Sequence, residues 1–221
     1  MKTTVVYVHG LWMTGLEGAL LRRRLRQELD AGTPLFTYRS LSAGIAANAR
    51  SLWRRLRYLR TDTLHLVGHS LGGLVICRMF EEFGDASLAP GRVVLLGSPV
   101  AGSRAAQNLA GWKIGRIIMG RTVREELLVQ RERQWGQNRD LGVIAGSSGV
   151  GLGRIVNTHD GCSDGTIYVD ETRIAGMKEH LVMQVSHSGL PLSAAVAAQT
   201  AAFLRCGRFN KSEELLATQR A

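Results

Sequence analysis

The chain has 221 residues, of which 45% are hydrophobic and 21% are charged. This is the composition of an ordinary globular protein, and the length is sufficient for one hydrophobic core, so we expect a single domain over residues 1–221. The three cysteines are an odd number and form no Cys-x-x-Cys pair, so the sequence indicates neither a disulfide framework nor a zinc site. No apolar stretch approaches the roughly 20 residues that a membrane-spanning helix needs.

Lysine and arginine outnumber the acidic residues 28 to 18, which gives a net charge of +10. Such a charge attracts phosphates, anionic lipid head groups and acidic partners. Many of the arginines alternate with leucines at helical spacing within residues 21–29 and 52–60, however, which is typical of the solvated faces of amphipathic helices. No recognition motif accompanies them, so we expect no nucleic-acid partner, while transient contact with an anionic membrane surface stays open.

The amino-terminal segment lacks the apolar core of a signal peptide, because polar residues and glycine interrupt it at once. The cysteine usage fits a reducing compartment. We therefore expect a soluble, cytoplasmic protein.

Short apolar or β-branched runs recur between helical stretches along the chain. The expected strands are residues 3–8, 35–38, 64–67, 93–96, 143–145 and 181–185, and the expected helices are residues 16–29, 45–59, 71–83 and 191–203. This alternation predicts a three-layer α/β fold with a mostly parallel sheet of about six strands and crossover helices on both faces.

Residues 104–139 interrupt this order, because they show helical patterning without a strand. The segment is too long for an ordinary loop. Two interpretations stay open: a small helical lid inserted over the carboxyl edge of the sheet, where open α/β folds bind ligands, or a plain extra helix packed on the sheet.

The run GHSLG at residues 68–72 places Ser70 between the strand 64–67 and the helix 71–83. A serine there lies on a tight turn that projects its hydroxyl, and glycines on both sides let strand and helix approach closely. The same pattern arises by chance, with a helix amino-terminal cap as the alternative. The strand before, the helix after and the His-Gly pair ending the first strand favour Ser70 as a nucleophile.

Acyl transfer by a serine requires backbone N–H groups directed at the developing oxyanion, each contributing about 3 kcal/mol. The amide of Leu71, at a helix amino terminus directly after Ser70, is one predicted donor. The amide of Leu11 is the other, in the loop where His9 and Gly10 end the first strand. We interpret His9 as shaping this loop, because it lies at the wrong end of the chain to be the general base.

A histidine must take the proton of the serine, and in this fold it follows the acid, which follows the serine. Three histidines come after Ser70. His187 lies between the last strand and the last helix, which directs it to the carboxyl edge of the sheet. His180 precedes that strand and is expected at the opposite edge, and His159 has no strand close before it. His187 is the predicted base.

The predicted acid is Asp164, in a loop after the strand 143–145 and between nucleophile and base along the chain. Asp160 is the nearest rival. Asp170 and Glu171 come later and could make structural hydrogen bonds instead. An Asp-Gly pair is also typical of a turn, so these alternatives stay open.

The resemblance to a known family rests on five runs of sequence. They are VHG at 8–10, GHSLGG at 68–73, LGSP at 96–99, DGT at 164–166 and HSGL at 187–190. They resemble bacterial α/β-hydrolases related to the lipase-like domain of the inositol deacylase family and, more loosely, triacylglycerol lipases. The resemblance runs nearly end to end and implies an α/β-hydrolase fold with a triad of Ser70, Asp164 and His187. Since the loop after Gly10 lacks the multi-glycine form of many esterases, it also implies an oxyanion hole bordered by the Leu11 side chain.

Together these residues predict a serine hydrolase that cleaves carboxylic esters of a small molecule or a lipid through an acyl-enzyme, with no metal or organic cofactor. A thioesterase or an acyltransferase could use the same triad, because fold and triad do not determine the substrate. The other alternative is a hydrolase-shaped module that binds anionic lipid or a partner without catalysis. The sequence does not indicate an oligomeric state.

Overall fold

The computed structural model describes residues 1–102, 133–149 and 161–210. The strands of this part form one parallel sheet whose spatial order follows the chain. They are β1 (Thr3–Val8), β2 (Thr63–His69), β3 (Val93–Leu96), β4 (Leu141–Gly146) and β5 (Glu179–Met183). All four neighbouring pairs are parallel, so every carboxyl end reaches the same edge of the sheet.

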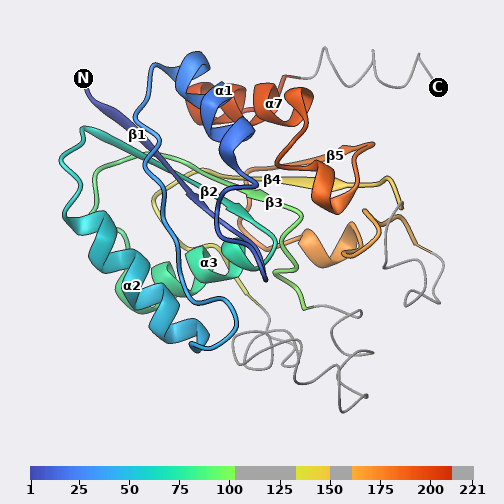
Figure 1. Ribbon diagram of the computed structural model, residues 1–221, viewed down its shortest axis with the longest axis horizontal. Helices are drawn as coiled ribbons and strands as arrows, with labels where there is room; N and C mark the ends of the chain where they lie inside the picture. Colours follow the sequence, from blue (N-terminus) through green and yellow to red (C-terminus); the bar gives the residue numbers. More distant parts are fainter. Residues whose placement is uncertain (103–132, 150–160, 211–221) are drawn as a thin grey trace.

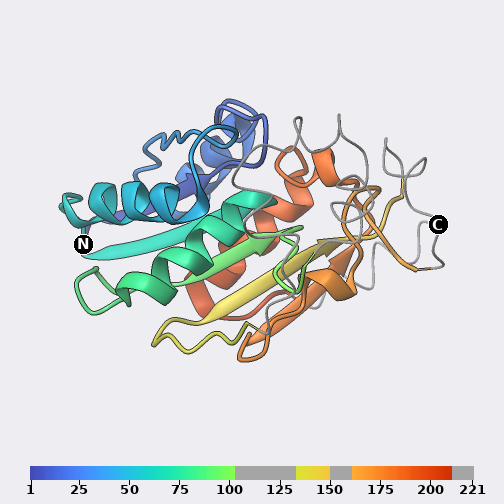
Figure 2. The ribbon, with the colours of Figure 1, turned by 90° about the horizontal axis from the view of Figure 1, so that it is seen from below.

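Helices cover both faces of this sheet (Figure 1). The helices are α1 (Ala19–Leu29), α2 (Ile45–Arg57), α3 (Leu71–Phe83) and α7 (Ala194–Cys206). Helices α1 and α7 pack together on one face, and α2 and α3 pack together on the other, as Figure 2 also shows from below. The predicted three-layer α/β architecture is confirmed.

The two hydrophobic cores follow from the alternation of side chains along the strands. Val5 and Tyr7 of β1 belong to the core beneath α1 and α7, while Val6 and Val8 belong to the core beneath α2 and α3. Because successive side chains of a strand point to opposite faces, a strand covered on both sides must be apolar at nearly every position. The continuous apolar runs read from the sequence therefore come from burial on both faces.

The strand expected at residues 35–38 is wrong. Residues 32–38 run along the outer side of β1 and pair with it at two isolated bridges instead of a continuous ladder. The bridges join Thr4 to Gly32 and Tyr7 to Leu35. Pro34 lies between the two bridges and has no N–H to donate to a ladder. The sheet of the described residues therefore has five strands, where the sequence predicted about six.

The insertion expected at residues 104–139 lies outside the described residues except for its last part, and so do His159 and Asp160. The described residues 133–139 are not helical. Trp135 is buried there, with its ring edge on Phe80 at 5.3 Å between centroids and its indole N–H donating to the Arg139 carbonyl at 2.6 Å. The end of the segment therefore packs beside α3. No helix in the described ranges is long and apolar enough to cross a membrane.

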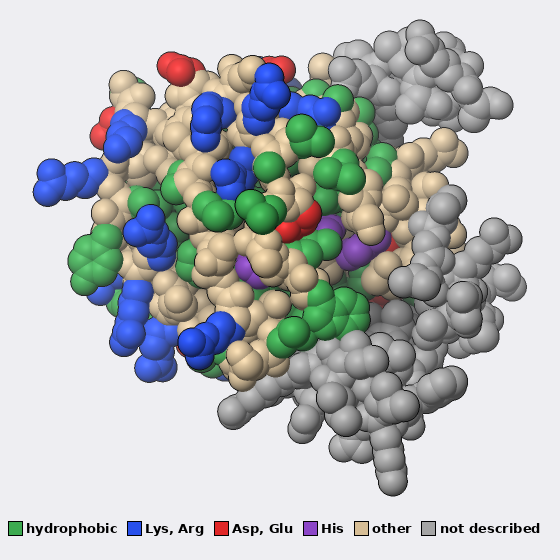
Figure 3. Space-filling view, in the orientation of Figure 1, with side chains coloured by type: hydrophobic (Ala, Val, Ile, Leu, Met, Phe, Trp, Pro, Cys, Tyr) green, Lys and Arg blue, Asp and Glu red, His purple; other side chains and the backbone are tan. Residues whose placement is uncertain are grey.

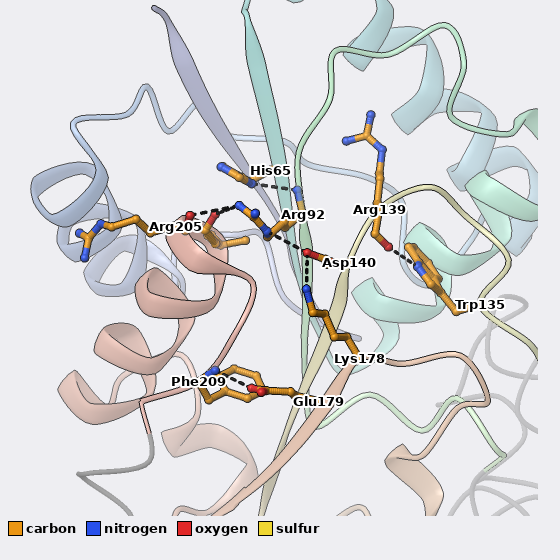
Figure 4. A network of polar contacts seen from close by, with 10 residues as sticks. His65, Arg92, Trp135, Arg139, Asp140, Lys178, Glu179, Arg205 and Phe209 are labelled. Atoms are coloured by element: carbon orange, nitrogen blue, oxygen red, sulfur yellow. Dashed lines mark hydrogen bonds and ion pairs between the residues drawn. The ribbon is translucent and has the colours of Figure 1, made fainter.

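Arginine side chains connect the segments at the amino edge of the sheet (Figure 4). Arg139 is 5% exposed, and its guanidinium donates to the carbonyls of Leu64 and Ala89 while facing Asp85 at 3.7 Å. Burial lowers the pKa of Arg139, and the Asp85 carboxylate opposes that shift. The segments that begin β2, β3 and β4 thus depend on one buried charge, whose two terminal nitrogens both donate within the fold.

Arg92 ties the same edge to the end of α7. Its side chain donates to Asp140 at 3.1 Å and to the Leu204 carbonyl at 2.9 Å, and its backbone N–H donates to His65 Nδ1 at 2.9 Å. Burial first, and then the charges of Arg92 and Arg139, lower the pKa of His65 to about 4. His65 therefore stays neutral in the folded protein.

Replacing Arg139 tests the first of these contacts. Arg139→Met leaves two buried carbonyls and Asp85 without their donor, so we expect the free energy of unfolding to fall by about 2–4 kcal/mol in urea denaturation. Arg55→Met, on the exposed face of α2, serves as the matched control and should change stability by less than about 0.5 kcal/mol. Equal effects of the two substitutions would contradict a structural role for Arg139.

The buried histidines predict that acid destabilises the protein. The pKa values of His65 and His69 are lowered from 6.5 to about 4 and about 3, so the unfolded chain binds protons that the folded chain does not. The contribution of these histidines to the free energy of unfolding is therefore fully present above pH 6.5. It falls as the pH drops toward 4, by up to about 1.4 kcal/mol per pH unit for each histidine. Between pH 7 and pH 5 we expect these two histidines to account for a loss of about 4 kcal/mol in urea titrations, and His9 and His180 add to it because burial lowers their pKa values as well. His65→Asn, whose amide oxygen can still accept from Arg92, should remove about 2 kcal/mol of that loss, and an unchanged pH dependence would refute this account.

Candidate active site

Ser70 occupies a strained turn between β2 and α3. Its backbone has φ +53° and ψ −123°, a conformation that side chains other than glycine rarely adopt. The close approach around the turn requires glycine at position 72, because a Cβ there would lie 2.0 Å from the Val8 carbonyl oxygen at the end of β1. The amide of Leu71 consequently lies at the first turn of α3, beside the end of β1.

The loop after β1 is held by a histidine whose two ring nitrogens are both engaged. The Tyr38 amide donates to His9 Nε2 at 3.3 Å, so Nδ1 carries the proton and donates to the Gly10 carbonyl at 2.8 Å. Tyr38 stacks on the ring at 4.2 Å between centroids, and its hydroxyl donates to the His9 carbonyl. Burial lowers the pKa of His9. These contacts fit the loop-shaping role expected of His9 and leave it no proton-transfer role.

This loop lies against the turn at Ser70. A Cβ on Gly10 would lie 3.2 Å from Ser70 Cβ, which is closer than an ordinary van der Waals contact, so a larger residue there would have to push the two segments slightly apart. Leu11 follows directly and is half-buried. The two expected oxyanion donors, the amides of Leu11 and Leu71, therefore come from segments on either side of Ser70.

Asp164 and His187 form a buried pair. The distance between Asp164 Oδ2 and His187 Nδ1 is 2.7 Å, and the other carboxylate oxygen accepts from the amides of Thr166 at 2.9 Å and Ile167 at 2.7 Å. The backbone adds a bond from the His187 N–H to the Asp164 carbonyl at 2.9 Å. An accepting carboxylate places the proton on His187 Nδ1, which leaves the lone pair on Nε2.

The end of β3 makes room for this pair. Gly97 has φ +54°, and a Cβ there would lie 3.1 Å from Asp164 Oδ2 and 3.2 Å from His187 Nδ1. Ser70 follows β2, Asp164 follows β4, and His187 follows β5 on the short 3₁₀ helix η3 (His187–Gly189). The structure thus brings all three predicted residues to the carboxyl edge of the sheet.

The rival residues within the described ranges lie elsewhere. His180 belongs to β5 itself, where the sequence placed it before the strand, and its Nε2 meets the Thr172 hydroxyl at 2.8 Å. Burial lowers its pKa to about 4. Glu171, on the 3₁₀ helix η2 (Asp170–Thr172), accepts from the Tyr168 amide at 2.9 Å. Neither side chain joins the pair of Asp164 and His187.

His69 is a neighbour of the site that the sequence reasoning missed. It is fully buried, its ring centroid is 4.9 Å from that of His187, and its Nε2 lies 3.1 Å from the His187 carbonyl oxygen. Burial, followed by the charge of His187, lowers the pKa of His69 to about 3, so it donates as a neutral ring. The only sequence signal for His69 was its position directly before Ser70, and the Gly-x-Ser-x-Gly motif allows any residue at that position.

Within the described residues, no group of three His, Cys, Asp or Glu side chains could hold a metal ion. Cys77 is buried, Cys162 and Cys206 are exposed, and all three are free thiols. Cys162 lies two residues before Asp164, and Cys77 lies in α3, which begins directly after Ser70.

No protein-family model and no curated protein matches the chain. Several solved structures, in contrast, are similar to it. The phospholipase PlaB from Legionella pneumophila, in complex with thio-NAD, is 18% identical with a TM-score of 0.71 over 99% of this chain, and this chain covers 61% of the phospholipase. A putative aryl esterase from Burkholderia cenocepacia is 14% identical with a TM-score of 0.62, over 92% of this chain and 90% of the esterase.

A third similar structure is the RedJ thioesterase from the prodiginine biosynthetic pathway in Streptomyces coelicolor. It is 11% identical with a TM-score of 0.59, over 91% of this chain and 84% of the thioesterase. Identities this low establish similarity of fold alone. The comparison shows that the chain has the α/β-hydrolase fold.

The contact between His69 and His187 predicts that His69 positions the loop of the base. His69→Leu removes the donor to the His187 carbonyl, and we expect kcat on a p-nitrophenyl ester to fall about tenfold to a hundredfold while KM changes little. His69→Gln retains an N–H of similar reach and should recover most of that loss. A kcat that stays at the wild-type value in His69→Leu, or a loss that Gln does not rescue, would show that His69 only fills space.

Proposed function

We propose that the protein is a serine hydrolase of carboxylic esters, with Ser70 as nucleophile, His187 as general base and Asp164 as the group that orients the base. The observation that carries this proposal is the 2.7 Å contact between Asp164 Oδ2 and His187 Nδ1. It lies at the edge of the sheet where Ser70 leaves β2 on a positive-φ turn. A buried carboxylate, an oriented imidazole and a projected serine in this chain order are what acyl transfer requires.

In the first half-reaction, His187 Nε2 takes the proton from Ser70 Oγ as that oxygen attacks the carbonyl carbon of the ester. The carbonyl oxygen becomes negative, and the amides of Leu11 and Leu71 donate to it. Collapse of this intermediate breaks the bond to the alcohol oxygen. His187 returns its proton to that oxygen, so the alcohol leaves neutral and the acyl group stays on Ser70.

In the second half-reaction, water takes the place of the alcohol. His187 accepts a proton from the water as it attacks the acyl carbon, and the same two amides hold the oxyanion. The bond to Ser70 Oγ then breaks, the serine regains a proton from His187, and the acid is released. Throughout the cycle Asp164 accepts from Nδ1 and stabilises the imidazolium.

The fold is compatible with more than one acyl substrate. Among the similar structures, two are named for a phospholipase and an aryl esterase, and a third is named for a thioesterase. A thioester is therefore the second candidate substrate, since the same two steps apply when the leaving group is a thiol.

Substitutions in the triad test the mechanism. With p-nitrophenyl esters of graded acyl length, we expect Ser70→Ala and Asp164→Asn to lower kcat by about 10⁴-fold. Asp170→Asn changes an exposed carboxylate of η2 and serves as the matched control, with wild-type turnover expected. A fluorophosphonate should label wild type at Ser70 and leave Ser70→Ala unmodified. Equal turnover by wild type and Ser70→Ala would refute the proposal.

A further inference from the structure

The exposed hydrophobic side chains of the protein are concentrated around the candidate active site. Nine large hydrophobic side chains are exposed among the described residues. Six of them lie in the segments that follow β1, lead into α2 or follow η3, all at the carboxyl edge of the sheet. We call these six the apolar rim: Trp12, Leu16, Leu20, Leu35, Leu41 and Leu192.

Several members of the apolar rim adjoin one another. Leu16, 69% exposed, precedes α1 and accepts a backbone bond from Ala19, while Leu20 follows one turn later and is 45% exposed. Arg24, one further turn along α1, donates to the carbonyl of Leu192. The start of α1 and the segment after His187 therefore form one continuous strip.

The loop after β1 extends this strip toward Ser70. The Leu35 side chain lies against Gly15, next to Leu16, where a Cβ on the glycine would meet it at 2.7 Å. Trp12 directly follows Leu11 and is 56% exposed, on a backbone with φ +58°. Isolated exposed leucines are normal on a protein surface, but a cluster at the mouth of a site marks a surface that contacts something apolar.

Positive charge accompanies the apolar rim. Residues 10–50 carry six arginines and three carboxylates, and the arginines of the last turn of α2 lie away from the rim. Of these carboxylates, Glu17 is turned inward, where it accepts from the Tyr7 hydroxyl and the Gly15 amide, and the other two lie at the far end of α1. Figure 3 shows hydrophobic side chains beside the histidines, with Lys and Arg on the outer sides of this face.

We propose that the apolar rim, with Arg23 and Arg39 beside it, docks on the surface of an anionic phospholipid bilayer. Exposed leucines and a tryptophan enter the boundary between head groups and acyl chains, and arginines pair with the phosphates. Charge complementarity favours an anionic bilayer as the binding partner. An apolar face flanked by positive charge fits a bilayer surface, which offers both apolar acyl chains and negative phosphates. The inference rests on the proposed function, since docking there would present lipid esters to Ser70.

Vesicle binding tests the proposal without lipid turnover. The Ser70→Ala protein is mixed with vesicles of phosphatidylcholine alone or with an equal part of phosphatidylglycerol, and the bound fraction is measured by flotation. We expect binding to the anionic vesicles only, weakened as salt is raised. Binding to both vesicles alike, or to neither, overturns the proposal.

Substitutions within the rim locate the docking face. Leu16→Ser with Leu20→Ser should weaken binding to anionic vesicles by about tenfold or more, and Arg23→Glu by about fivefold or more. In the Ser70-containing protein the same leucine substitutions should leave turnover of a short-chain soluble ester at the wild-type level. Tyr58→Ser is the matched control, because Tyr58 is 85% exposed at the opposite end of α2 and should not affect binding.

The possible outcomes separate this proposal from the proposed function. If Ser70→Ala retained esterase activity, the proposed mechanism would be wrong. Vesicle binding would still test the docking proposal, because the binding assay does not depend on turnover. If the leucine and Tyr58 substitutions weakened binding equally, the docking face would not be the rim. If wild type failed to bind vesicles and instead self-associated through Leu16 and Leu20, a second copy of the chain would be the occupant, and the bilayer proposal would be wrong.

Discussion

The turn at Ser70 is the constraint on which the rest of the site depends. A side chain held at φ +53° is tolerated only where the surrounding structure enforces it, and here the first turn of α3 is pressed against the end of β1. Gly72 allows that contact, since any Cβ would meet the Val8 carbonyl. The same contact brings the loop of Gly10 and Leu11 beside the serine. One strained residue therefore sets the positions of the candidate nucleophile and of both candidate oxyanion donors.

Asp164 and His187 reach this edge of the sheet through loops that are themselves held by backbone hydrogen bonds. Asp164 accepts two amides of its own loop and one imidazole, and its carbonyl accepts the amide of His187. His69 then joins this pair to the nucleophile turn, because it precedes Ser70 in the chain and lies within hydrogen-bond distance of the His187 carbonyl. Gly97 leaves the space that the pair occupies. The geometry is therefore determined by contacts between loops of four different strands, and few of these contacts are local in sequence.

The two edges of the sheet differ in what their charged groups do. At the amino edge, Arg92 and Arg139 donate to carbonyls and a carboxylate of the fold, so these charges stabilise the packing of this edge. At the carboxyl edge, hydrophobic side chains are exposed, and Arg23 and Arg39 come beside them in the sequence. Exposed apolar surface lowers stability in water and persists where binding uses it.

Local sequence alone determined the layered α/β architecture and the place of the elbow. Strands buried on both faces require continuous apolar runs, so β1, β3 and α3 could be read with their observed bounds, and GHSLG marked the turn at Ser70. The strand expected at 35–38 failed because an apolar run does not reveal whether a neighbour can pair with it, and Pro34 limits that pairing. Only the tertiary structure decided that Asp164 meets His187, that His69 contacts the His187 carbonyl, and that the exposed leucines gather at one edge. These are relations between residues far apart in the chain, and no local pattern encodes a distance that folding alone creates.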